Sequence, residues 1–393
     1  MTPVPGAGFT RFFDADPDRL HVAAHSHHPW PDVSFDGQQQ AWLDAARLID
    51  RKWDHVFAAV LPETQAHIAA RLGLPDPATV VVAPNTHELL MRLMSCLDPP
   101  VRVLTTDGEF TSFERQIRRL AEDGLAEVER VPVAPLHNAA ERLAGAAARG
   151  GHDLVWFSHV FYDSGGVIGD LEQIIAAVPD DDTFVAIDGY HGFMALPTDL
   201  SAVADRAFYL AGGYKYAMSG EGVCFAHCPP GYGPRPRDTG WFADFSALSD
   251  SPDGRVGYAP GGQRFFGATF DPTALYRFNA VQRWLSDVGW TVAAIHRHVA
   301  GLQRRFLDGL DHTRTSLLAP GDLATDPRGD REHGNLLAFE HPRASAVTAA
   351  LRSAGVVVDH RGTRVRAGFG VYHDADDVTA LMERLSSAAL APG

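Results

Sequence analysis

The chain has 393 residues, of which 45% are hydrophobic and 21% charged, and its formal net charge is -15. This size and balance are typical of a soluble globular protein with a large buried core, divided into roughly two to three domains. The negative charge repels phosphate backbones and anionic lipid, so nucleic acid and membranes are poor candidate partners. Three cysteines (Cys96, Cys224 and Cys228) are too few for a disulfide framework, and the first residues contain no apolar signal segment, so we expect a cytoplasmic protein.

The amino-terminal segment HVAAHSHHPWPD is rich in histidine, with His21, His25, His27 and His28 close together. Such a run can indicate metal binding, but this one has no acidic or cysteine partner at a regular ligand spacing. We therefore predict no metal site here. His28, which precedes Pro29, is expected to have a structural role.

The middle of the chain alternates short apolar strands with amphipathic helices. Helical patterns such as His87–Leu97 and Phe113–Ala121 lie between the strands. This alternation predicts an α/β domain in which helices cover a parallel sheet. The predicted strands are Val80–Ala83, Val101–Thr105, Val128–Val133, Leu154–Ser158, Phe184–Ile187, Ala207–Ala211 and Val223–His227.

The pattern changes from about Asp271 onwards. Long amphipathic helices are predicted over Ala274–Leu285 and Val292–Leu310, with Pro272 at the start of the first. A smaller α+β domain is expected to follow, and the polar segment Thr315–Gly334 is predicted to be an exposed loop between the domains. The expected elements of the smaller domain are strands Leu336–Phe339, Val356–Asp359 and Val365–Ala367 and helices Ala344–Ser353 and Ala375–Ser387.

Three candidate catalytic residues follow two successive strands. In FVAIDGYHGF an apolar strand leads to Asp188 and then His191, and in RAFYLAGGYKYA the next strand leads to Lys215 in a glycine-flanked turn. Because ligands gather at the carboxyl ends of strands in open α/β sheets, these side chains could face one cleft. A lysine amine can form a Schiff base with pyridoxal phosphate (PLP), while a carboxylate keeps the pyridine nitrogen protonated. The alternative is a pair of solvated charges at loop tips, because short motifs also occur by chance.

Together these motifs resemble kynureninase and the broader class V aminotransferase group. The resemblance rests on D-x-x-H at Asp188 and His191 and on Y-K-Y around Lys215, with supporting motifs from about His21 to Tyr372. It implies the fold-type I PLP-dependent transferase fold, which is α/β with a mainly parallel seven-stranded sheet and a smaller α+β C-terminal domain. The implied division is an N-terminal segment at the small domain and substrate entrance (1–60), a large PLP-binding domain (61–270), and linker helices with the small domain (271–393).

The resemblance also implies roles around pyridoxal 5'-phosphate. Lys215 would carry the Schiff base and shuttle protons, Asp188 would pair with the pyridine nitrogen, and His191 would sit beside the ring oxygen or Asp188. Free N–H groups at a helix start over 85–87 would attract the phosphate, although a simple helix cap at Thr86 explains that sequence equally well. The other cofactor-binding candidates are Asn85, Thr86 and His87 at that helix start, Phe110 on the ring, Ser158 and His159 on the sheet side, Tyr214 at the phosphate, and Trp241 and Thr269.

Substrate contacts are implied for Arg366 and for the histidine-rich segment. Arg366 matches the arginine that clamps a substrate α-carboxylate, which suits a planar guanidinium, while His25, Ser26 and His27 would line the entrance. In the relatives, the element that corresponds to Thr269 reaches the phosphate of the neighbouring subunit, which implies a homodimer. The chain departs from its relatives over 162–165, where Tyr-Asp-Ser-Gly replaces a turn that often carries a basic residue. This departure weakens the case for kynurenine itself as the substrate.

Three functions remain open. Kynureninase-like hydrolytic or lyase cleavage of a side-chain bond of an α-amino acid is favoured by the D-x-x-H and Y-K-Y elements. A class V aminotransferase is the alternative within the group, and a catalytically inactive binding protein with the same fold is the alternative of another class. A cysteine desulfurase is disfavoured, because 315–334 contains no cysteine and Cys224 and Cys228 lie on a strand after the lysine.

Overall fold

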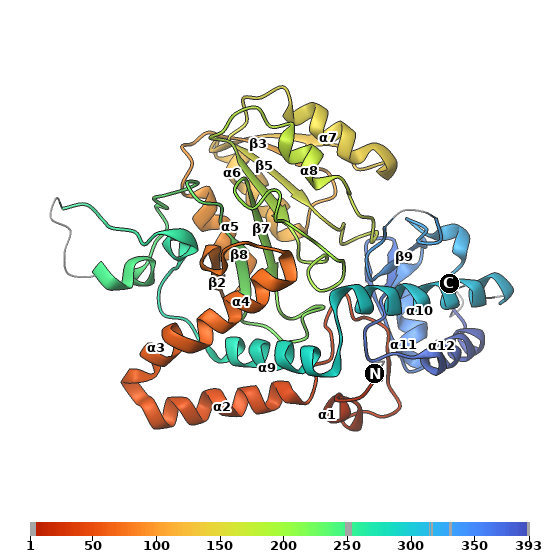
Figure 1. Cartoon of the computed structure of the whole chain (residues 1–393). Helices are drawn as coiled ribbons and strands as arrows, with labels where there is room; N and C mark the ends of the chain where they lie inside the picture. Colours follow the sequence, from red (N-terminus) through yellow and green to blue (C-terminus); the bar gives the residue numbers. More distant parts are fainter. Residues whose placement is uncertain (1–4, 248–253, 314, 316, 330–331, 391–393) are drawn as a thin grey trace.

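The structure is a computed structural model, which describes residues 5–247, 254–313, 315, 317–329 and 332–390. A seven-stranded sheet forms the centre of the larger part, and a three-stranded sheet lies in the smaller part beside both termini (Figure 1). The strand order of the large sheet is β2-β8-β7-β6-β5-β3-β4. All its neighbouring strands are parallel except β8, which is antiparallel to both β2 and β7. The predicted α/β fold with a mainly parallel sheet is confirmed.

The strands of the large sheet agree with the predicted ranges to within two residues. The largest difference is in β4, which begins and ends two residues earlier than predicted because it pairs in register with β3, from Val101 opposite Ala126 to Thr106 opposite Val131. The strands are β2 (Val80–Ala83), β3 (Val101–Thr106), β4 (Ala126–Val131), β5 (Leu154–Ser158), β6 (Phe184–Asp188), β7 (Ala207–Gly212) and β8 (Cys224–His227).

Helices surround this sheet because each places an apolar face on the core. In α5, for example, Leu89, Leu90 and Leu93 are buried, and the helix ends at Met94 rather than at the predicted Leu97. The helices that follow the strands are α5 (Thr86–Met94), α6 (Thr111–Glu122), α7 (Ala139–Ala147) and α8 (Leu171–Ala176). Before β2 lie α1 (Thr10–Asp14), α2 (Val33–Leu48), α3 (Lys52–His55) and α4 (Leu61–Leu72), and the long α9 (Thr273–Val288) packs against α2 and α4.

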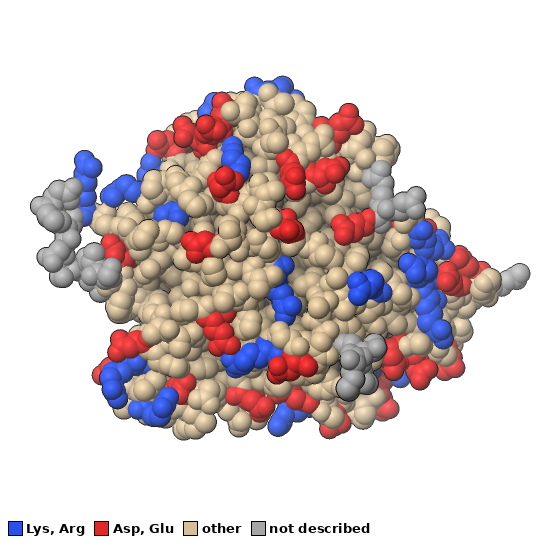
Figure 2. Space-filling view, in the orientation of Figure 1, with Lys and Arg blue, Asp and Glu red and all other residues tan. Residues whose placement is uncertain are grey.

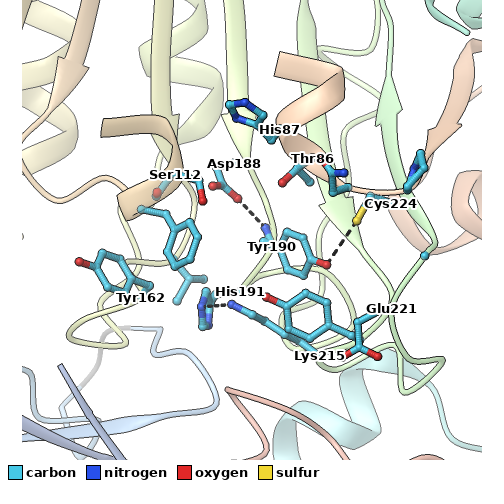
Figure 3. Close-up of a pocket in the computed structure, with 17 residues that line it drawn as sticks. Thr86, His87, Ser112, Tyr162, Asp188, Tyr190, His191, Lys215, Glu221 and Cys224 are labelled. Atoms are coloured by element: carbon cyan, nitrogen blue, oxygen red, sulfur yellow. Dashed lines mark hydrogen bonds between the residues drawn. The ribbon is translucent and has the colours of Figure 1, made fainter. Parts of the chain in front are cut away.

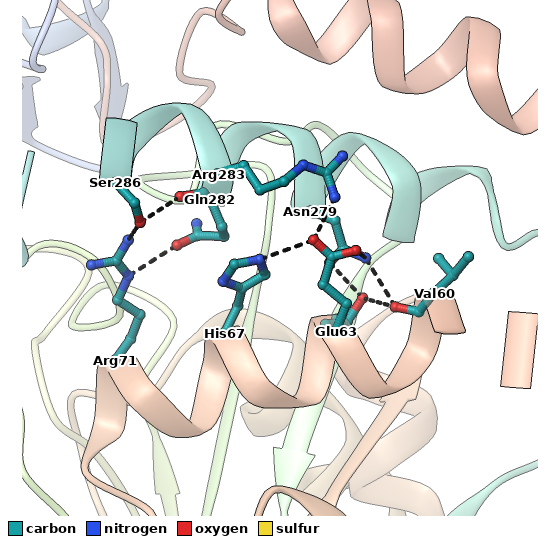
Figure 4. A network of polar contacts seen from close by, with 9 residues as sticks. Val60, Glu63, His67, Arg71, Asn279, Gln282, Arg283 and Ser286 are labelled. Atoms are coloured by element: carbon teal, nitrogen blue, oxygen red, sulfur yellow. Dashed lines mark hydrogen bonds and ion pairs between the residues drawn. The ribbon is translucent and has the colours of Figure 1, made fainter. Parts of the chain in front are cut away.

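A polar network joins α4 to α9 (Figure 4). Asn279 donates through Nδ2 to the carbonyl of Val60 at 2.9 Å and accepts from the hydroxyl of Thr64 at 2.8 Å, and Arg71 donates to Gln282 at 3.0 Å. Asn279 is buried, so its partners replace the hydrogen bonds that water would make. Gln282 is also buried and accepts from Arg71, while its Nε2 has no partner among the described residues. The network fixes how α9 crosses the large domain before the chain enters the smaller part.

The smaller part contains the sheet β11-β12-β9, in which all pairs are antiparallel. Leu20, which lies in β1 and is far away in sequence from the other strands, belongs to the apolar core of this part, and β1 pairs in parallel with β10. The division of the chain at residues 60 and 270 stays a prediction. The elements of this part are β1 (Leu20–His21), α10 (Val292–His312), β9 (Leu337–Glu340), α11 (Ala344–Ser353), β10 (Val356–Val357), β11 (Asp359–Arg361), β12 (Arg364–Ala367) and α12 (Ala375–Ser387).

The segment 315–334 is less exposed than predicted in the part that the structure describes. Leu317 and Leu318 are buried in the core of the smaller part, and His333 is buried beside the backbone of Gly166, with which it forms a bridge. Two adjacent leucines inside a polar segment were the available signal, and the density of Asp, Arg, Gly and Pro around them outweighed it.

No helix among the described residues is long and apolar enough to cross a membrane. On the face shown in Figure 2, Lys and Arg side chains lie interspersed with Asp and Glu. The net negative charge of the sequence is therefore not gathered into a single acidic area on that face.

Candidate active site

A cavity of about 450 Å³ lies at the carboxyl ends of β5, β6 and β7 (Figure 3). Its size is that of a typical small-molecule site. Because parallel strands end at the same edge of the sheet, residues that follow different strands meet there. The cavity brings together nine of the twelve residues predicted to bind the cofactor, namely Asn85, Thr86, His87, Phe110, Ser158, Asp188, His191, Tyr214 and Lys215.

Lys215 and His191 are in direct contact inside the cavity. The Nζ of Lys215 lies 2.5 Å from the Nε2 of His191, and both side chains are buried. Burial lowers the pKa of Lys215 to about 7, although the charge of Asp188 opposes this shift. Burial, and then the charge of Lys215, also lowers the pKa of His191 well below its ordinary value. A neutral His191 accepts a hydrogen bond from Lys215 at Nε2 and therefore carries its own hydrogen on Nδ1.

Asp188 is held at the end of β6. Its Oδ1 accepts a hydrogen bond from the backbone N–H of Tyr190 at 2.9 Å. Burial raises the pKa of Asp188, while the Tyr190 N–H and the charge of Lys215 oppose the rise. A carboxyl group in this setting binds a cationic partner strongly, because such a partner removes the cost of burying the charge.

Three aromatic rings surround the amine of Lys215. Its Nζ lies 5.6 Å from the ring centre of Phe110, 5.0 Å from that of Tyr190 and 5.6 Å from that of Tyr214. The sequence analysis missed Tyr190, although it stands between Asp188 and His191 in the same motif. Its ring needs the glycine at Gly212, where a Cβ would lie 2.2 Å from the Tyr190 hydroxyl. A planar group joined to the amine would find apolar rings close by.

The amino-terminal end of α5 forms another part of the cavity wall. Asn85, rather than Thr86, caps the helix, because its side chain accepts the backbone N–H of Glu88 at 2.9 Å. The simple cap at Thr86 is thus not what the structure shows. The positive end of the helix dipole points at this wall, which favours an anionic group.

A buried carboxyl group supports the floor of the cavity. Glu109 precedes Phe110 and accepts the backbone N–H of Ser158 at 3.1 Å and its hydroxyl at 2.7 Å. Burial raises the pKa of Glu109 to about 8, and the charge of Asp188 adds to the rise. The sequence analysis did not find this residue, because a single glutamate after a strand has no distinguishing neighbour in the sequence.

Three predicted cofactor residues lie away from the cavity wall. His159 follows Ser158, so its side chain points to the other side of the strand, where it faces Tyr209 with ring centres 6.3 Å apart. Trp241 donates from Nε1 to the hydroxyl of Thr269 at 3.2 Å. This pair does not line the cavity.

The four predicted substrate residues do not line the cavity either. Arg366 donates from Nε to Asp359 at 2.8 Å, and the ring of His25 lies 3.0 Å from the same carboxylate. His27 stacks on Tyr214 with ring centres 5.5 Å apart, and Ser26 contacts His27 at 3.3 Å. His27 therefore covers a wall residue from outside, whereas Arg366 and His25 are bound to an internal partner.

The unusual acidic turn over 162–165 has a partner in the smaller part. Asp163 accepts a hydrogen bond from Nη1 of Arg364 at 2.5 Å, and Arg364 also donates to Glu340 at 2.6 Å. Arg364 lies on β12, so this ion pair joins the small sheet to a loop of the large domain. The acidic residue in this turn is thus explained by an arginine 201 residues later.

Comparisons with known proteins agree with this fold. Residues 51–381 match the family described as aminotransferase class-V. The fold is similar to that of C-DES, in two structures. One is a mutant with glycine covalently linked to its PLP cofactor, with a TM-score of 0.77 and 18% identity over 97% of this chain and 99% of that chain. The other is the cystine C-S lyase bound to its product cysteine persulfide, with a TM-score of 0.77 and 18% identity over 96% of this chain and 99% of that chain. The apo cysteine desulfurase of Thermococcus onnurineus NA1 is also similar (TM-score 0.74, 16% identity, 98% of each chain).

A search of curated protein sequences found no match. The family match confirms the class V part of the predicted resemblance, and its kynureninase-like part stays a prediction.

Proposed function

The chain is a pyridoxal phosphate-dependent enzyme of the class-V aminotransferase family with the fold-type I architecture, and on that premise we propose that it cleaves a side-chain bond of an α-amino acid. The observation that carries this proposal is the contact of 2.5 Å between Lys215 and His191 inside the cavity. Transamination needs one group that moves a proton at the α-carbon, whereas side-chain cleavage also needs a proton at the departing group. A second acid–base group beside the lysine therefore favours cleavage.

The residues of the cavity fit the cofactor. Lys215 offers a buried amine with a lowered pKa, and Asp188 offers a carboxyl group that favours a cationic partner. The Nδ1 of His191 is buried and has no hydrogen-bond partner among the residues that the structure describes, so it can donate to a bound oxygen. We propose that Lys215 binds the aldehyde, that Asp188 binds the pyridine nitrogen and that the start of α5 with Tyr214 binds the phosphate.

When bound, pyridoxal phosphate withdraws electrons from the substrate and so weakens the bonds at its α-carbon. The protein supplies the rest of the chemistry. A Lys215 amine with a pKa of about 7 is about half neutral at pH 7, so a large fraction of it can take a proton. His191 accepts a hydrogen bond from the amine at Nε2, and the rings of Phe110 and Tyr190 exclude water from it.

Cys224 lines the cavity, but its state supports a hydrolase or lyase rather than a desulfurase that uses a protein thiolate. Its Sγ lies 3.4 Å from the Tyr190 hydroxyl, and burial raises the pKa of the Cys224 thiol to about 11. A thiol that stays protonated at neutral pH is a poor nucleophile. The structure of a cystine C-S lyase with the same fold shows that this architecture can host cleavage of a side-chain bond.

We also keep the homodimer and the cytoplasm as proposals. Exposed apolar side chains support the dimer, since Trp42 is 71% and Trp241 41% exposed and such groups often mark an interface. The three cysteines are free, which is consistent with a reducing compartment. Light scattering on the purified protein should give twice the mass of one chain, and a monomer at all concentrations would contradict the dimer.

The chain offers a sharp test of the cofactor linkage, because it contains two lysines, Lys215 and Lys52. The holoenzyme should absorb near roughly 420 nm. Borohydride reduction and peptide mapping should place the phosphopyridoxyl group on Lys215. The band should vanish in Lys215→Ala and persist in the matched control Lys52→Ala. A label on Lys52, or on neither lysine, would refute the assignment.

The reaction is tested by its products. The holoenzyme is incubated with L-kynurenine, 3-hydroxykynurenine, cystine and a panel of other amino acids, and the products are identified by mass. Alanine with an anthranilate, or any other split of the side chain, supports cleavage. Accumulation of pyridoxamine phosphate and a keto acid without a broken side-chain bond would favour the aminotransferase alternative. A protein that binds no cofactor would favour the inactive binding protein.

A further inference from the structure

The side chain of Tyr190 extends along the cavity from the end of β6 towards the start of α5. Its backbone N–H donates to Oδ1 of Asp188 at 2.9 Å, and its hydroxyl lies 3.4 Å from Sγ of Cys224 on β8 (Figure 3). The same thiol takes a hydrogen bond from the backbone of Thr86, the first residue of α5. The Tyr190 hydroxyl therefore lies beside the wall that the amino-terminal end of α5 forms, and Tyr190, Cys224 and Thr86 all line the cavity.

A glycine on the neighbouring strand makes room for this hydroxyl. Gly212 ends β7 and is paired with Cys224 on β8. A Cβ at Gly212 would collide with the Tyr190 hydroxyl, so the hydroxyl occupies the space that a side chain at position 212 would take. The ring of Tyr214 packs against the ring of Tyr190 with centres 5.1 Å apart. These neighbours hold the Tyr190 hydroxyl in place before any ligand binds, which lowers the cost of ordering it on binding.

The Tyr190 hydroxyl is a hydrogen-bond donor at neutral pH. Burial, and then the neighbouring Cys224 and Tyr214, raises the pKa of Tyr190 well above its ordinary value. Burial also raises the pKa of the Cys224 thiol to about 11, so this group stays protonated too. Either atom can be the donor in the contact between them. When the thiol donates to the tyrosine oxygen, the hydroxyl hydrogen is free to bind a ligand in the cavity.

The cavity has few positive charges with which to bind an anion. Its described lining residues include one lysine, Lys215, and no arginine. Because Lys215 is assigned to the cofactor aldehyde, the phosphate is left mainly with uncharged donors and the positive end of the α5 dipole. Each hydroxyl in such a setting matters, since a hydrogen bond to a charged group contributes more than one between neutral groups.

We infer that Tyr190 is a cofactor-positioning residue, whose hydroxyl donates a hydrogen bond to the phosphate of pyridoxal phosphate beside the start of α5. This inference rests on the proposed function and deepens it, because Asp188 and Tyr190 belong to the same short segment after β6. That segment binds both ends of the cofactor, the pyridine nitrogen through Asp188 and the phosphate through Tyr190. It thereby keeps the cofactor aligned with its aldehyde beside Lys215.

The test compares pyridoxal phosphate with pyridoxal, which differ in the phosphate. The full-length protein, freed of cofactor, is titrated with each compound, and binding is followed by absorbance near roughly 420 nm. Tyr190→Phe removes the hydroxyl and keeps the ring. It should weaken the binding of pyridoxal phosphate by about tenfold or more and change the binding of pyridoxal by less than about threefold. The matched control Tyr276→Phe removes a hydroxyl that contacts Asp44 away from the cavity, and it should leave the ratio of the two dissociation constants unchanged.

Phosphorus NMR of the holoenzyme gives a second measurement that does not depend on activity. Hydrogen bonds to a phosphate dianion favour that form, so the loss of one donor should move the pH titration of the cofactor phosphate to higher pH in Tyr190→Phe but not in Tyr276→Phe. A Tyr190→Phe variant with the wild-type ratio of dissociation constants and the wild-type phosphate titration would overturn the inference. Equal weakening of both compounds would also overturn it, because the ring and not the hydroxyl would then be the binding group. A wild type that binds neither compound on Lys215 would instead be a failure of the proposed function.

Discussion

The two sheets present different kinds of charged residue around the cavity. At the edge of the large sheet, Lys215 is buried and Asp188 half-buried, the pKa of each is moved towards its neutral form, and His191 has an unsatisfied Nδ1. At the small sheet, Asp359 and Arg366 form a complete ion pair with His25 against the same carboxylate. Buried groups with unmet hydrogen bonds and displaced pKa values are where a ligand is expected. The comparison teaches that residue type alone does not identify a binding group, because its partners decide whether it is free to bind.

The largest expected effect on activity comes from a substitution of Asp188, at the end of a strand of the large sheet. Asp188→Asn should keep the cofactor on Lys215 but lower the rate of product formation by about 10²–10⁴-fold, because an amide cannot stabilise a protonated pyridine nitrogen. Product formation is measured by mass and cofactor linkage by peptide mapping. Activity within about tenfold of the wild type would show that Asp188 is not the group that binds the pyridine nitrogen, and the contrast with the small-sheet ion pair would be lost.

A smaller effect is expected where the two sheets meet. Asp163→Asn removes the link from Arg364 to the loop that carries the wall residue Tyr162 and should lower kcat/KM about threefold, in line with a partly exposed ion pair. Glu340→Gln is the matched control, since Glu340 pairs with the same arginine inside the small sheet. Equal losses in both variants would mean that the link between the sheets has no special role.

The smallest effect concerns stability and pH at Glu109. The folded protein raises the pKa of Glu109 from its ordinary 4.5 to about 8, so between these values the folded state binds more protons than the unfolded state. The stability that this group contributes is thus present at low pH and is lost as the pH rises towards 8. Glu109→Gln should match the wild type near pH 5 and exceed its stability by roughly 1–4 kcal/mol near pH 9.

Urea unfolding at a series of pH values measures this difference. Glu114→Gln on the exposed side of α6 is the control, and its difference from the wild type should not grow in the same way. If the difference in free energy of unfolding between Glu109→Gln and the wild type shrinks with rising pH, Glu109 is ionised in the folded protein. In that case the charge of Glu109 beside the large sheet would be balanced by its partners, as the charge of Asp359 in the small sheet is by Arg366.

Nine of the residues that line the cavity could be predicted because the necessary information is local. Asp188 and His191 share one motif, Lys215 follows the next strand, and parallel strands bring their carboxyl ends to one edge. The prediction was less complete where successive side chains of a strand point to opposite faces of the sheet, as for His159. It was also less complete where the hydrogen-bond partner of a residue lies far away in the chain. Tyr190 was missed because a tyrosine is an ordinary core residue until a glycine on the neighbouring strand leaves room for its ring.

By itself, the sequence determined the α/β fold and the group of residues around Lys215, because the periodicity of apolar residues and the position of polar residues after strands are properties of short segments. Only the tertiary structure decided which charges are free. Arg366 meets Asp359 across a strand pair, Asp163 meets Arg364 at 201 residues' distance in the chain, and His25 reaches Asp359 from 334 residues away. Electrostatic compensation acts through space over a few ångströms, so it depends on contacts that no local pattern records.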